Sequence, residues 1–144
     1  MDYIAWILTL SGLIVLAFFD VRTRHVPLIA LLLLLAAGIV FSVLRQDLLQ
    51  AVTGLLPGLF LCLLSFLTGG QVGYGDGIFY LAAGLLLGGM SCLTGLVFSL
   101  LLSSVTGALL LALKKATRKS RLPFLLFSAL GFAGAFGLFL GGAL

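Results

Sequence analysis

The sequence has no glutamate, one histidine and two cysteines, and only 8% of its 144 residues are charged. Soluble domains carry roughly 25% charged residues, so this composition excludes an ordinary soluble protein. A single histidine excludes zinc sites that use two or three histidines. Cys62 and Cys92 form no C-x-x-C pattern, and we expect neither a metal site, nor a cofactor, nor a disulfide. Acid–base chemistry is left with four carboxylates, which are Asp2, Asp20, Asp47 and Asp76.

Long apolar runs make up most of the chain. Hydrophobic residues account for 62% of it, and the mean hydropathy is +1.35. No polar stretch between the apolar runs exceeds about ten residues, which leaves no room for a separate soluble domain. The sequence therefore predicts an all-α, polytopic membrane protein in which residues 1–144 form one membrane-embedded domain.

The apolar runs predict six transmembrane helices. The expected segments are 3–19, about 27–44, about 48–67, 77 to about 89, a fifth that ends near 113, and a sixth from 122 to the C-terminus. We place the reversal between the fourth and fifth at residues 88–91, with Gly95 as the competing position. Pro57 and Gly58 are expected to kink the third helix. Gly131, Gly134 and Gly137 are expected at close helix–helix contacts.

The basic residues predict how the helices cross the membrane. The breaks after the first and fifth helices hold Arg22 and Arg24 and the cluster 114–121, whereas the opposite face has Arg45 alone. The positive-inside rule then places the basic breaks in the cytoplasm and both termini outside it. These positive charges fit lipid headgroups, so we expect membrane lipids and not nucleic acid as their partners. The oligomeric state is left open.

This topology puts Asp20 and Asp76 on the same, cytoplasmic, face. If the fourth helix runs only from Gly77 to about Gly89, it spans roughly 20 Å, which is less than a hydrocarbon core of about 30 Å. Asp76 would then lie below the membrane surface. A carboxylate at that depth is costly, and such residues are commonly functional.

Asp76 lies in a stretch with five glycines between residues 69 and 77. One interpretation is structural, with the carboxylate acting as the N-cap of the fourth helix. The other is functional: Gly73, Gly75 and Gly77 would let the backbone adopt unusual conformations and bring a substrate strand close to Asp76.

Asp20 ends the first helix, where the helix dipole disfavours an anion. An ion pair with Arg24, or contacts at the membrane interface, would compensate. Alternatively, Asp20 pairs with Asp76; two nearby carboxylates share a proton, so that one can deprotonate water while the other protonates a carbonyl. Arg22, Arg24, His25 and Pro27 follow Asp20 and are candidates for substrate or interface contacts.

These residues together resemble the type IV prepilin peptidase and preflagellin peptidase family of GxGD aspartyl membrane proteases. The resemblance rests on Asp20 followed by Val26-Pro27, on Gly73-Tyr74-Gly75-Asp76 after the third apolar run, and on Leu122-Pro123-Phe124 opening the last one. It covers nearly the whole chain. The sequence departs from the family at Ile78, where members often carry lysine, and lacks the paired cysteines of the large bacterial enzymes.

The resemblance implies an intramembrane aspartyl endopeptidase with Asp20 and Asp76 as catalytic pair and without a metal or cofactor. Its substrate would be a type IV prepilin or pseudopilin, cut between a basic leader and an apolar helix at the cytoplasmic face of a prokaryotic plasma membrane. We do not extend the implied activity to N-methylation. The alternative function is a small membrane transporter or assembly scaffold in which the same aspartates bind a cation or a partner helix.

Overall fold

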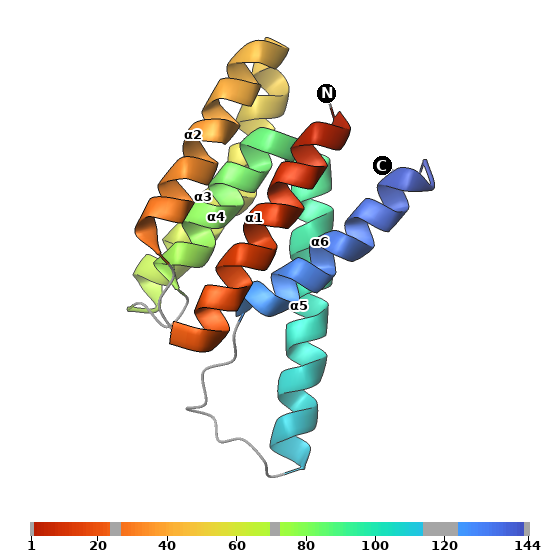
Figure 1. The fold of residues 1–144 in the computed structure, drawn as a ribbon. Coiled ribbons are helices and arrows are strands. Elements are labelled where there is room, and N and C mark those ends of the chain that lie inside the picture. Colours follow the sequence, from red (N-terminus) through yellow and green to blue (C-terminus); the bar gives the residue numbers. More distant parts are fainter. Residues whose placement is uncertain (1, 24–26, 70–72, 114–123, 143–144) are drawn as a thin grey trace.

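The structure is a computed structural model that describes residues 2–23, 27–69, 73–113 and 124–142. These residues form six α-helices and no strand (Figure 1). The helices are α1 (Asp2–Thr23), α2 (Leu28–Arg45), α3 (Leu48–Leu67), α4 (Tyr74–Leu87), α5 (Gly89–Ala112) and α6 (Phe124–Leu140). The all-α prediction is confirmed for the described residues, and the N- and C-terminal ends lie toward the same end of the bundle.

Two helix boundaries differ from the predictions at the polar segments. α1 continues past Asp20 to Thr23, because Arg22 lies in its last turn, where a cation suits the helix dipole. α4 begins at Tyr74, three residues earlier than predicted. Gly73 takes an extended conformation as its N-cap, and the Gly73 carbonyl accepts the Asp76 N–H at 3.1 Å. The predicted glycine-rich loop is therefore partly helix.

The reversal between α4 and α5 is a single residue. Gly88 has φ +83°, a conformation that favours glycine, and its carbonyl accepts the Cys92 N–H at 3.1 Å. The break lies inside the predicted range of 88–91, and Gly95 lies within α5. α3 has the predicted bounds, and it remains one helix through Pro57.

α4 lies at the centre of the bundle, where it packs against α1, α2, α3 and α5. Its contact with α3 is an antiparallel seam of small residues that we call the α3–α4 seam. It consists of Gly54, Gly58 and Cys62 on α3 facing Gly84, Leu81 and Gly77 on α4. A Cβ on Gly54 or Gly84 would overlap the backbone carbonyl of the other glycine. Small residues at this spacing let two membrane helices approach closely.

The predicted packing role of the α6 glycines is correct for only one of the three. Gly131 lies against the backbone of α5 at Ser99, whereas no atom lies within 4 Å of a Cβ built on Gly134 or Gly137. Gly131 is buried, whereas Gly134 and Gly137 are exposed. Their predicted close packing was wrong.

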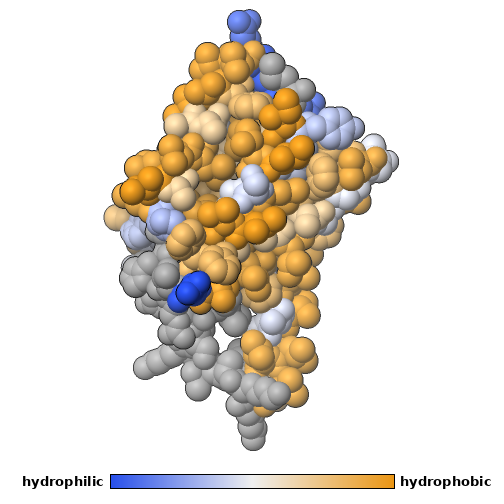
Figure 2. Space-filling model, viewed as in Figure 1, coloured by the Kyte–Doolittle hydropathy of each residue, from blue (hydrophilic) through white to orange (hydrophobic). Residues whose placement is uncertain are grey.

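The outer surface is apolar, as expected in lipid. Figure 2 shows a face covered mostly by hydrophobic side chains, with hydrophilic residues at the upper end and a separate strongly hydrophilic group in the lower half. Four helices (α1, α2, α3 and α5) are long and apolar enough to cross a membrane, and α4 and α6 are apolar but shorter. The chain is therefore built as a multi-pass membrane protein.

Candidate active site

Asp20 lies in the last turn of α1 and is partly buried. Its carboxylate accepts a hydrogen bond from the backbone N–H of Leu125, the second residue of α6. The first N–H groups of a helix have no partner within the helix and carry partial positive charge, so they suit an anion. The structure thus supplies a partner for Asp20 that the sequence analysis missed, while Arg24 lies outside the described residues.

Asp76 is the third residue of α4 and is partly buried. It is not the N-cap, as one interpretation of the sequence had it, because Gly73 occupies that position. The side chain folds back toward the cap: a Cβ built on Gly73 would lie 3.2 Å from Asp76 Oδ2. Gly73 therefore leaves the space that the carboxylate occupies.

The two aspartates come together in space although 56 residues separate them in the sequence. Asp20 is in the last turn of α1, Asp76 is in the first turn of α4, and these two helices pack against each other. Burial is the larger influence on the Asp76 carboxylate, and the charge of Asp20 is near enough to add to it. The described part of the chain therefore holds two carboxylates, from two helices, at one end of the bundle.

The other motif residues have structural roles. Gly77 is buried in the α3–α4 seam, where a Cβ would lie 2.5 Å from Cys62 Sγ, so its absent side chain serves helix packing. Gly75 is partly buried. Ile78, at the position where the resembling family often has lysine, packs against the hydrophobic core. A lysine in the same orientation would place its charge against apolar side chains.

The candidate contact residues after Asp20 are only partly described. Arg22 is exposed, and its guanidinium lies 5.9 Å from the centre of the Phe18 ring, one turn earlier on α1. Pro27 is the N-cap of α2, and its carbonyl accepts the Ala30 N–H at 3.1 Å. Arg24 and His25 lie outside the described residues, as does the basic cluster at 114–121.

Sequence reasoning also missed a polar cluster one turn from Asp76. The Tyr80 hydroxyl lies 3.1 Å from Ser128 Oγ, and both side chains are buried. Tyr80 follows Asp76 by four residues, and this spacing puts both on one face of α4. This four-residue spacing is the sequence feature from which the position of Tyr80 beside Asp76 could have been predicted.

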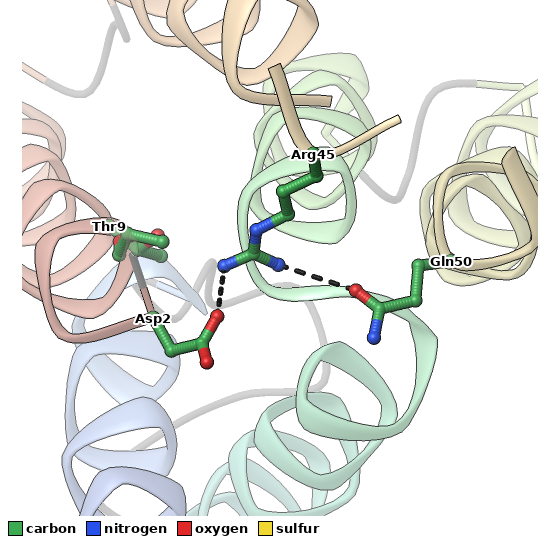
Figure 3. A network of polar contacts seen from close by, with 5 residues as sticks. Asp2, Thr9, Arg45 and Gln50 are labelled. Atoms are coloured by element: carbon green, nitrogen blue, oxygen red, sulfur yellow. Dashed lines mark hydrogen bonds and ion pairs between the residues drawn. The ribbon is translucent and has the colours of Figure 1, made fainter. Parts of the chain in front are cut away.

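The opposite end of the bundle holds a different set of charges. Arg45, at the end of α2, forms an ion pair of 2.5 Å with Asp2 at the start of α1 and lies 3.4 Å from Gln50 Oε1 on α3 (Figure 3). These residues line a cavity of about 140 Å³ together with Trp6 and residues of α4, α5 and α6. Within the described ranges, no group of three His, Cys, Asp or Glu side chains could hold a metal ion.

Comparison with known proteins gives one finding. The model of the type IV leader peptidase family matches residues 7–112, which is more than half of the chain and includes both Asp20 and Asp76. No curated protein and no solved structure gives a significant match. The chain belongs to the type IV leader peptidase family.

Proposed function

We propose that this protein is an intramembrane aspartyl endopeptidase in which Asp20 and Asp76 form the catalytic pair. It removes the basic leader of type IV prepilin-like or pseudopilin substrates at the cytoplasmic face of a prokaryotic plasma membrane. Membership of the leader peptidase family supports the peptidase activity. The observation that carries the aspartyl mechanism is that Asp20, in the last turn of α1, and Asp76, in the first turn of α4, are partly buried at the same end of two helices that pack against each other.

The chemistry follows from what two adjacent carboxyl groups can do. One carboxylate takes a proton from water, and the resulting hydroxide attacks the scissile carbonyl carbon. The other carboxyl group gives its proton to the carbonyl oxygen, which removes the charge that would otherwise build up there. When the intermediate collapses, the C–N bond breaks and the leaving amine takes a proton from the group that had deprotonated the water. A hydroxyl of the intermediate gives its proton back to the other carboxylate as the new carbonyl forms. The pair returns to its starting protonation.

The surroundings of the pair support a site that water and a peptide can reach. Asp20 and Asp76 are each only partly buried, so neither is sealed in the core. The hydrogen bond from Leu125 uses one acceptor position of Asp20, and a carboxylate has further lone pairs for water. The seven basic residues in the sequence segments that follow α1 and α5 support a cytoplasmic orientation for this end of the bundle, with six spans and both termini outside.

The test is cleavage of a co-expressed prepilin from the same genome in membranes that contain wild-type protein, Asp20→Asn or Asp76→Asn. We expect the cleavage rate to fall by at least about a hundredfold in each variant, because a carboxamide can neither accept nor supply the proton. Asp47→Asn is the matched control. Asp47 caps α3 through the Gln50 N–H at 3.2 Å, and asparagine is an equally good cap.

Retained cleavage in Asp20→Asn or Asp76→Asn, with the variant protein present in membranes, would refute the catalytic pair. An intact substrate beside well-expressed wild-type protein would refute the peptidase and favour the transporter or scaffold. Equal loss of activity in Asp47→Asn would show that the assay reports folding and not catalysis.

A further inference from the structure

Tyr80 is a buried polar residue next to the proposed catalytic pair. It lies one helical turn after Asp76 on α4, and its side chain is 0% exposed. Its ring packs among aromatic side chains, with centroid distances of 5.7 Å to Phe132 and 6.3 Å to Phe124 on α6. A phenylalanine would make the same ring contacts. The hydroxyl is therefore the feature that needs an explanation.

The hydroxyl connects three helices. It lies 3.1 Å from Ser128 Oγ on α6, and Ser99 on α5 is its second side-chain partner. Both serines are 0% exposed, and Ser99 also donates a hydrogen bond of 2.6 Å to the Gly95 carbonyl. Buried polar groups that are fully paired restrict a core to one arrangement, because every alternative leaves a group without its partner.

The start of α6 contacts both aspartate-bearing helices. Leu125, in its first turn, donates its backbone N–H to Asp20 on α1. Ser128, three residues later, pairs with Tyr80 on α4. Both contacts are made within the first five residues of α6. The start of α6 thus fixes the position of α1 relative to α4 at the end where the two carboxylates meet.

We propose that Tyr80 and Ser128 are positioning residues for the catalytic pair. Their hydrogen bond aligns α4 with the start of α6, and α6 holds Asp20 through Leu125, so that Asp76 is kept at the working distance from Asp20. This inference rests on the proposed function, because it assigns the two side chains a role in the same reaction. Neither residue touches the substrate.

A positioning residue and a residue that only stabilises the fold have different effects on the kinetics. A positioning residue sets how well the two carboxyl groups are placed for proton transfer, so its loss lowers kcat, while the surface that binds the substrate is unchanged and KM stays the same. A residue that only stabilises the fold lowers the amount of active protein without changing kcat per folded molecule.

The experiment uses the full-length protein in detergent or vesicles with a prepilin substrate. We expect Tyr80→Phe and Ser128→Ala each to lower kcat by about tenfold and to leave KM within about twofold. The double variant should lose no more than either single variant, because both substitutions remove the same hydrogen bond. Thr9→Val is the matched control: Thr9 is a fully buried hydroxyl whose partner is the Ala5 carbonyl within α1, and kcat should be unchanged.

A second measurement does not depend on proteolysis. Asp20→Cys and Asp76→Cys are combined in a chain that also carries Cys62→Ala and Cys92→Ala, and a short thiol-specific cross-linker reports how often the two positions come together. Adding Tyr80→Phe should lower the cross-linking yield at least about threefold if alignment is lost. Adding Thr9→Val should leave the yield unchanged.

Three results would overturn the proposal. The first is an unchanged kcat in folded Tyr80→Phe, and the second is an unchanged cross-linking yield in that background. The third is a double variant whose loss is the product of the two single losses. None of these results bears on the catalytic pair, which is refuted if Asp20→Asn or Asp76→Asn still cleaves.

Discussion

α1 carries one aspartate near each end, and the two differ in every respect except residue type. Asp2 lies in the first turn, where the helix dipole favours an anion, is 63% exposed and forms an ion pair with Arg45. Asp20 lies in the last turn, where the dipole is unfavourable, and is partly buried. Its neighbours are the N–H of Leu125 and a second carboxylate, Asp76.

The difference separates a charge with a structural partner from the one that we propose to be reactive. The fold pairs Asp2 with a cation, and this ion pair joins the start of α1 to the end of α2. At the other end it places Asp20 beside another negative group, an arrangement that costs free energy unless a proton is shared. A stable fold does not need that arrangement, whereas acid–base catalysis does. The predictions below test whether the two ends differ in this way.

The largest loss of stability is expected from a substitution in the α3–α4 seam, because α4 lies at the centre of the bundle. In Gly84→Ala the new Cβ overlaps the carbonyl of Gly54 across the α3–α4 seam, and backbone cannot move aside as a side chain can. We expect a loss of about 2–3 kcal/mol of stability, seen as lower accumulation and easier unfolding in detergent. Gly134→Ala, where no atom lies within 4 Å, should change stability by less than about 0.5 kcal/mol. Equal effects of the two substitutions would contradict the seam.

The next largest effect should be confined to the end of the bundle that holds Asp20 and Asp76, and it should be a loss of activity. Gly77→Ala places a Cβ 2.5 Å from Cys62 Sγ and must shift the first turn of α4, which carries Asp76. We expect kcat to fall by about tenfold or more while the protein still accumulates. Adding Cys62→Ala removes the sulfur and should restore part of the activity. If the double variant is no better than Gly77→Ala, the clash with the sulfur is not the cause.

The smallest effect is expected at the ion-pair end. Asp2→Asn removes the negative charge that pairs with Arg45, yet Asp2 is mostly exposed, so the stability should fall by about 1 kcal/mol or less. Cleavage by folded protein should stay within about twofold of wild type, in contrast to Asp20→Asn on the same helix. A large loss of kcat in Asp2→Asn would mean that the two ends are not independent.

Much of the fold was predictable because long apolar runs bounded by charges determine membrane helices. α3 has the predicted bounds, from the turn before Leu48 to the glycine-rich stretch after Leu67. The reversal at Gly88 was predicted because the apolar run from Ile78 was too long for one span. Asp20 and Asp76 could be singled out because the chain has so few carboxylates.

The rest depended on contacts that a single sequence does not contain. Glycine-rich composition predicted a loop where α4 already begins, because helix formation there is supported by packing against α3 at Gly77 and not by helix propensity. The partner of Asp20 is a backbone N–H of Leu125, a group that every residue except proline has and that no residue pattern marks. The same limit applies to Gly134 and Gly137, since the spacing of glycines does not show which face of α6 is covered.

The single residue between α4 and α5 also matters for how the protein enters the membrane. α4 has 14 residues, fewer than the roughly 20 that an independent span needs, and Gly88 leaves no polar loop before α5. We therefore expect α4 and α5 to enter the membrane together, as a helical hairpin that turns at Gly88. Asp76 would then reach its depth in the membrane as part of this hairpin, because α4 is too short to insert as a separate span. A longer or polar linker at this position would uncouple the two helices during biogenesis.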